Sequence, residues 1–229
     1  MAGITAVLTF AASRGQDLQE LCEAVGLDAG LFRAPLTRVP FTLTRRVWLS
    51  VIERLPHDNV GVGVGTAAHG EHAAYASLFL SQARSALDLV QRMIDAAPVS
   101  DTALVADPVT MRQRGQHVEI RLPAVLSAGI PERAQAAFLM LLISLRRLGL
   151  PELKPLWVRA AHAKDAKRAQ VEPHYGCKVQ WDAGEDVMCF ERAPLQPPLP
   201  GSHPRTSELL RSPSADEVKR RSTSPSRIA

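Results

Sequence analysis

The sequence predicts an α+β fold: a helix-rich first half packs with one central helix against a small, mainly antiparallel sheet. Helical periodicity dominates roughly the first hundred residues. Short alternating runs, typical of strands, lie on both sides of residues 131–149, which form an almost wholly apolar helical stretch. With 229 residues, of which 46% are apolar, the chain can bury a substantial core.

The central helix is predicted over Pro131–Gly149. Its start is indicated by proline and glutamate, and its end by Arg146 and Arg147 in the last turn with Gly149 as C-cap. Apolar residues occupy almost every position from 136 to 145, so no face is left for water. The run is well short of the ~20 apolar residues that span a bilayer. We therefore expect a buried core helix that the other elements cover.

Five further helices are expected in the first half, and a sixth segment is left open. Ile4–Ala12 is read as the first structural segment and not as an export signal, because no Lys or Arg precedes it. Asp58–Ala68 alternates like a strand, yet Asp58 could cap a helix. The expected helices are Leu18–Val25 ended by Gly26, Asp28–Phe32, Leu43–Leu55 capped by Thr42, Ala73–Leu80 and Ser85–Ala97.

The second half is expected to supply the strands. A β-hairpin is predicted from Val109–Gln113 and His117–Leu122, which flank a short glycine-containing connection. Asp165–His174 is predicted as a polar helix. Three more strands are expected at Leu156–Ala161, Lys178–Trp181 and Val187–Glu191, the last two around a turn at Asp182–Asp186.

Charge and cysteine usage narrow the class of protein. The odd set of Cys22, Cys177 and Cys189 contains no CxxC, which favours a reducing compartment and hence the cytoplasm. Residues 205–229 carry six basic and three acidic side chains, so residues 1–204 carry 21 and 20. A near-neutral body gives no electrostatic indication of nucleic-acid binding. We expect one domain over 1–204 and a disordered Ser/Arg-rich tail over 205–229.

Several segments resemble one family of bacterial regulators. The run from Pro173 to Pro204 is similar to the closing segment of the N-terminal effector domain, of the arabinose-binding type, in AraC/XylS-type transcription regulators. The matching features in that run are Tyr175-Gly176-Cys177, Val187–Phe190, Glu191-Arg192-Ala193 and Leu199-Pro200. Agreeing segments elsewhere are AVGLD at 24–28, RVPFTL at 38–43, Trp48, NVGVGVG at 59–65 and LWVRAAHA at 156–163.

The resemblance carries expectations about structure and function. It implies that the glycine-valine stretch starts a helix, which decides the open reading of Asp58–Ala68. It implies a small-molecule effector-sensing regulatory domain, a homodimer and no cofactor. In the family a DNA-binding region follows, whereas here about 25 Ser/Arg-rich residues stand in its place. We therefore expect no specific DNA binding by this chain alone. The rival function is a dimerisation or protein-interaction module with no small ligand.

The candidate effector contacts are drawn from the few aromatic residues and two arginines. Ordinary core packing is the favoured explanation of Trp48, Tyr75, Phe79 and Trp157. In the functional alternative they wall a pocket, with Arg159 or Arg121 as counter-charge to an anionic ligand. The pocket is expected between the N-terminal helices and the sheet.

Other functional readings are disfavoured. Residues 20–34 imitate a helix-turn-helix, but Pro35 shortens the second helix and leaves only Arg33 to face DNA. Gly61, Gly63 and Gly65 lack the spacing of a nucleotide loop and are better explained by close helix packing. His69, His72, His174 and Cys177 could form a zinc site only if the fold gathered them. Because no nucleophile motif is present, we expect no enzyme.

Overall fold

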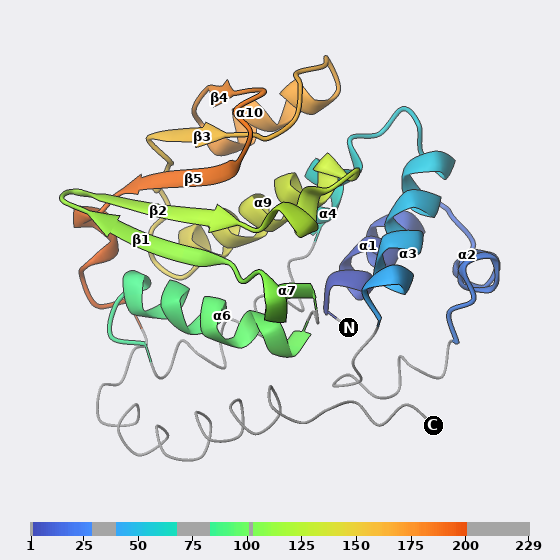
Figure 1. Cartoon of the computed structure of the whole chain (residues 1–229), viewed down its shortest axis with the longest axis horizontal. Coiled ribbons are helices and arrows are strands. Elements are labelled where there is room, and N and C mark those ends of the chain that lie inside the picture. The colour runs from blue at the N-terminus through green and yellow to red at the C-terminus, as the bar shows by residue number, and fades with distance from the viewer. Residues whose placement is uncertain (1, 29–39, 68–82, 101–102, 201–229) are drawn as a thin grey trace.

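The computed structural model describes residues 2–28, 40–67, 83–100 and 103–200. It confirms the α+β class. In Figure 1 the sheet lies on the left and the N-terminal helices on the right, with α9 and α4 between them. The sheet has five strands in the order β1-β2-β5-β3-β4. Among the described helices, none combines the length and the apolar character needed to cross a membrane.

Four helices form the N-terminal layer: α1 (Ala2–Ser13), α2 (Leu18–Val25), α3 (Phe41–Arg54) and α4 (Val60–Ala67). Gly26 ends α2 in the left-handed conformation, as predicted. The prediction of Thr42 as the cap of α3 was wrong: the helix begins at Phe41, and Pro40 is the N-cap without a side-chain bond. Proline suits this position because its missing N–H costs no helical hydrogen bond. The helices expected at Asp28–Phe32 and Ala73–Leu80 lie in or extend into segments outside the described residues.

The glycine-valine stretch forms the helix α4, and its glycines allow close packing, as predicted. A Cβ added to Gly61 would lie 2.7 Å from the carbonyl oxygen of Glu132, and one on Gly65 would lie 2.6 Å from Leu139 Cβ. On another side, a Cβ on Gly63 would meet the ring of Phe10 in α1. Small residues therefore let α4 lie directly against α9.

Helix α9 (Pro131–Arg147) is buried on most sides, as predicted. It contributes to two hydrophobic clusters. Ala136 and Met140 pack with the N-terminal helices. Phe138, Leu142 and other residues pack with the sheet. The C-cap is Leu148, one residue before the expected Gly149, which follows at φ 124°. The central helix thus connects the two halves of the molecule.

All five predicted strands are present. The second has the predicted bounds, the first is shifted by one residue, the third and fourth are shorter, and the fifth begins one residue earlier. Strand β2 pairs antiparallel with β1 and β5, β5 pairs antiparallel with β3, and β3 pairs parallel with β4. Val118, Ile120, Met188 and Phe190 belong to the cluster that contains α9, so they define the inner face. The strands are β1 (Thr110–Arg114), β2 (His117–Leu122), β3 (Trp157–Arg159), β4 (Val179–Gln180) and β5 (Asp186–Glu191), and the neighbouring helices are α6 (Ala86–Ser100), α7 (Ala103–Ala106) and α8 (Ala124–Ser127).

The polar helix predicted over Asp165–His174 is split, which corrects the sequence reading. A 3-10 turn, η2, covers Arg168–Val171, and a single helical turn, α10, covers Glu172–Tyr175. Proline at 173 supplies no N–H for a helix running through this segment, but it is tolerated in the first turn of a new one. A last 3-10 turn, η3, covers Ala193–Leu195.

Candidate functional site

An open cleft lies beyond the C-terminal end of α9. Its volume is about 570 Å³, within the roughly 300–1,000 Å³ typical of small-molecule sites. Glu152, Lys154 and Glu191 add charged groups to its lining. Most of the lining is apolar, and includes Leu150, Pro151, Leu153, Pro155, Leu156 and Cys177.

Arg146, near the end of α9, is hydrogen-bonded to segments at this cleft. Its Nε donates to the carbonyl oxygen of Leu153 at 2.7 Å, and its Nη1 and Nη2 donate to those of His174 and Tyr175 at 2.9 and 3.3 Å. One planar guanidinium therefore joins the loop after α9 to the end of α10. Leu153, and Gly176 directly after α10, line the cleft, so Arg146 connects two parts of its wall.

Two residues in the cleft stand out. Leu156 is 46% exposed and presents apolar surface in the cleft. Cys177 is half-buried, and burial, followed by the nearby Glu172 carboxylate, raises the pKa of its thiol. At neutral pH the cleft thus presents a neutral thiol, which favours an apolar ligand surface over a nucleophile.

A second, much smaller pocket lies between α9 and the sheet. It holds about 10 Å³, enough for one water molecule. The ring of His162 lies edge-on to Trp181, with the centroids 5.6 Å apart, and its Nδ1 is 4.0 Å from Asp186 Oδ1. Within the described residues neither ring nitrogen of His162 has a hydrogen-bond partner. Burial lowers the pKa of His162, whereas Asp186 opposes that shift.

A third feature lies on the outer face of the sheet. The guanidinium groups of Arg159 and Arg121 both approach the carboxylate of Glu185, at 3.1 and 3.7 Å. Arg159 Cζ also lies 4.7 Å from the ring centre of Trp157. The two arginines that the sequence suggested as counter-charges are thus brought to one carboxylate.

The other predicted contacts are distributed differently. Trp48 is buried in the cluster of the N-terminal helices, away from Trp157 and Arg159, which lie on β3. Tyr75 and Phe79 lie outside the described residues. Arg159 also lines the small pocket between α9 and the sheet. The sequence analysis missed Arg146, which it read only as a helix stop signal.

A metal centre finds no support in the described part of the chain. No group of three or more His, Cys, Asp or Glu side chains there could hold an ion. His174 and Cys177 are described, whereas His69 and His72 are not.

The family model described as the arabinose-binding domain of AraC transcription regulators, N-terminal, matches residues 15–199. The chain belongs to this family. Members of the arabinose-binding-domain family are regulatory parts of transcription regulators, which agrees with the resemblance found in the sequence. No curated protein matches this chain.

The fold also occurs in a solved regulator. The crystal structure of the transcriptional regulator CdpR from Pseudomonas aeruginosa is similar, with a TM-score of 0.53 and 15% sequence identity. The match covers 76% of this arabinose-binding-type chain and 58% of the CdpR chain. At this identity the likeness shows a shared fold.

Proposed function

We propose that this chain is a small-molecule effector-sensing domain and that its effector binds in the cleft held by Arg146. The observation that carries the proposal is an apolar cleft of about 570 Å³ built onto the end of α9. Its size suits a small ligand, and the exposed Leu156 gives an apolar ligand a surface to cover.

The position of the cleft supports a signalling role. Arg146 belongs to α9 and holds both loops that line the cleft. Helix α9 packs on the sheet with one set of side chains and on the N-terminal helices with another. A ligand that moves the loops would therefore act on α9, which contacts both halves. A ligand can shift a protein between two conformations only if it binds one of them more tightly than the other.

A thermal-shift screen of small molecules tests the proposal. A compound at a hundredfold excess over its Kd should stabilise the fold by about 2.7 kcal/mol, or roughly 5–10 °C in Tm for a domain of this size. Hits are then repeated with Leu156→Trp, which places bulk at the cleft.

Leu49→Trp is the matched control. Leu49 is 40% exposed on α3, against 46% for Leu156, so both variants exchange an exposed leucine for tryptophan. The proposal requires that Leu156→Trp removes the ligand-induced shift and that Leu49→Trp keeps it. Equal shifts in both variants would place the ligand elsewhere, and Trp48, Tyr75 and Phe79 would be the next residues to test.

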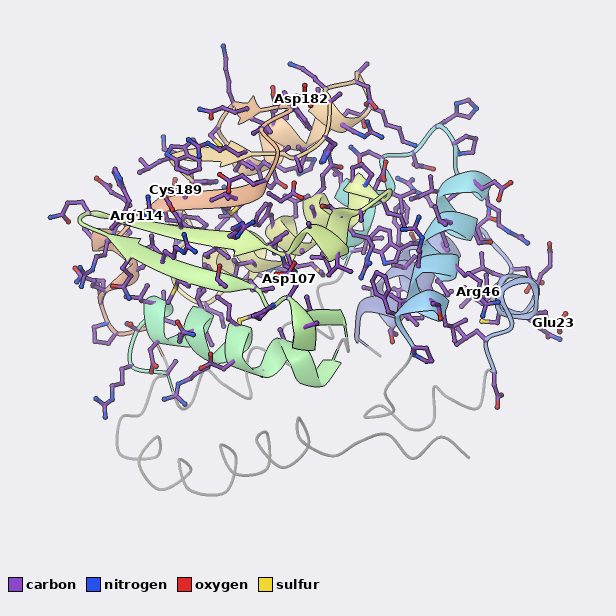
Figure 2. All side chains as sticks on the ribbon, viewed as in Figure 1. Glu23, Arg46, Asp107, Arg114, Asp182 and Cys189 are labelled. Atoms are coloured by element: carbon purple, nitrogen blue, oxygen red, sulfur yellow. The ribbon has the colours of Figure 1, made fainter. Side chains whose placement is uncertain are left out.

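Dimerisation without a small ligand is the second candidate. It is favoured by Leu18 and Leu49, which are exposed on α2 and α3; Figure 2 shows Glu23 and Arg46 on the same two helices. A second copy of this chain seated there would cover both leucines. Sedimentation of the wild type and of Leu49→Glu decides this. A wild type that is dimeric and a variant that is monomeric would support the second candidate.

We further propose that the chain alone does not recognise operator DNA. Residues 1–204 carry 21 basic and 20 acidic side chains, and only non-specific, salt-sensitive contacts are expected from the basic residues 219–221. A footprint on a defined site at physiological salt would contradict this.

A further inference from the structure

We propose that Arg121 and Arg159 form a binding site for a free carboxylate anion, which Glu185 occupies as a tethered carboxylate. The site lies on the outer face of the sheet. It does not depend on a ligand in the Arg146 cleft, so either proposal can fail without the other.

The strand order brings the two arginines together. Strand β5 lies between β2 and β3, and Val187 pairs with Arg121 on one side and with Arg159 on the other. Directly paired residues project from the same face of a sheet. Both guanidinium groups therefore stand on one face with the buried Val187 between them.

Arg159 is held in place before any ligand arrives. Its guanidinium lies over the ring of Trp157. Its Nε donates to Gln180 Oε1 at 3.2 Å, and its Nη1 donates to Glu185 Oε1 at 3.1 Å. A planar donor group fixed by stacking and by a neutral amide loses little freedom when it binds a carboxylate.

The carboxylate of Glu185 indicates which chemical group the site binds, and its exposure indicates that a free ligand can displace it. This carboxylate contacts both guanidinium groups, so these three side chains together carry a net charge of +1. The side chains of Arg121, Arg159 and Glu185 are 50%, 41% and 36% exposed. Ion pairs at such exposure contribute little to stability, so a free carboxylate can replace the tethered one.

The turn that carries Glu185 can transmit its displacement. Asp182 and Gly184 both have positive φ, 57° and 73°, just before β5; Figure 2 marks Asp182 in this turn and Cys189 on the strand that follows. The neighbouring Asp186 accepts the backbone N–H of Ala161 at 3.0 Å, next to His162.

The segment that follows His162 is hydrogen-bonded to the N-terminal half. Asn59, at the start of α4, donates from Nδ2 to the carbonyl oxygen of Lys167 at 2.7 Å, and Lys167 Nζ donates to that of Pro56 at 3.2 Å. Movement of Glu185 would thus act on a short segment that is hydrogen-bonded to both halves of the molecule.

The test is a titration of the full chain with sodium propionate, whose length matches the Glu185 side chain, at constant ionic strength. The Arg Nε and Trp indole signals in ¹H–¹⁵N spectra report binding. Glu185→Gln should bind propionate about tenfold more tightly than the wild type, because the tethered competitor is gone. Glu20→Gln is the matched control: Glu20 pairs with Arg54 at 3.0 Å on the N-terminal helices, away from the sheet, and its loss changes the net charge equally.

Three results would overturn the proposal. The first is an equal gain in Glu20→Gln, which would indicate a general charge effect. The second is the absence of saturable binding in Glu185→Gln. The third is unchanged binding when Arg159→Gln or Arg121→Gln is added to Glu185→Gln. A phosphate titration distinguishes the anion: a response equal to that of propionate would contradict a site for carboxylates.

Discussion

Gly65 of α4 lies against Leu139 of α9 so closely that a Cβ at position 65 would be 2.6 Å from Leu139 Cβ. Real Cβ atoms are essentially never found at such a distance. The two residues belong to helices that pack closely over several turns, so neither can move away easily. The glycine is therefore required by the approach of the two helices and not by its own backbone conformation.

The first prediction is that Gly65→Ala destabilises the fold although alanine favours helices. Overpacking a tight contact typically costs about 1–3 kcal/mol, more than the roughly 1 kcal/mol that alanine contributes over glycine in a helix. Urea unfolding measures the difference. Glu53→Ala on the exposed side of α3 is the control and should change little. Increased stability of Gly65→Ala would mean that α4 and α9 are not packed as described.

The second prediction concerns Arg146. Arg146→Met removes three hydrogen bonds to backbone carbonyls and should destabilise the fold by about 3 kcal/mol, since each bond to a charged group contributes about 1.5–3 kcal/mol and the losses overlap. The neighbouring Arg147 is exposed, so Arg147→Met should stay within about 0.5 kcal/mol of the wild type. Equal effects would remove Arg146 from its role in the cleft.

The third prediction separates two roles of Asn59. Its Oδ1 accepts the N–H of Val62, which caps α4, and its Nδ2 donates to the carbonyl oxygen of Lys167. Asn59→Asp keeps the acceptor and loses the donor, whereas Asn59→Ala loses both. We expect both variants to expose amides of residues 163–168 to faster hydrogen exchange, and only Asn59→Ala to fray α4. Unchanged hydrogen exchange of these amides in both variants would contradict a structural link through Asn59 and Lys167.

Local patterns predicted the helices well because their causes are local. The apolar run of α9 and the small residues of α4 are visible in a single segment, and both were confirmed. The role of Arg146 was not visible, because its carbonyl partners lie 7, 28 and 29 residues further along the chain.

The outer-face site shows the same limit. The sequence suggested Arg121 and Arg159 separately, but only the insertion of β5 between β2 and β3 brings them together. For Trp48 the sequence left core packing and a pocket wall as alternatives, and the structure places it in the core of the N-terminal helices. No local pattern indicates strand order or which cluster an aromatic residue joins.

The fourth prediction is a pH dependence that originates at His162. Burial lowers its pKa below the ordinary 6.5, against the opposing effect of Asp186; Arg168 also lowers it, and Glu132 and Asp165 raise it. The unfolded chain therefore takes up a proton at higher pH than the folded one. The contribution of His162 to the free energy of unfolding should be complete above pH 6.5. It should be lost progressively as the pH falls from about 6.5 toward the lowered pKa.

His162→Gln should flatten this slope, whereas His117→Gln, at an exposed position on β2, should leave it unchanged. Denaturant unfolding at several pH values between about 5 and 7.5 gives both slopes. An identical slope in wild type and His162→Gln would exclude His162 as the source.

The most direct test of effector sensing at the cleft is the protection of Cys177. Cys177 lines the cleft and is half-buried, whereas Cys22 and Cys189 are buried, and burial raises the pKa of Cys189 to about 11. The alkylation rate of Cys177 is measured by mass spectrometry with and without a compound that raises Tm. At a hundredfold excess over Kd, bound effector should slow alkylation about a hundredfold. Unchanged alkylation alongside a full rise in Tm would contradict binding in the cleft.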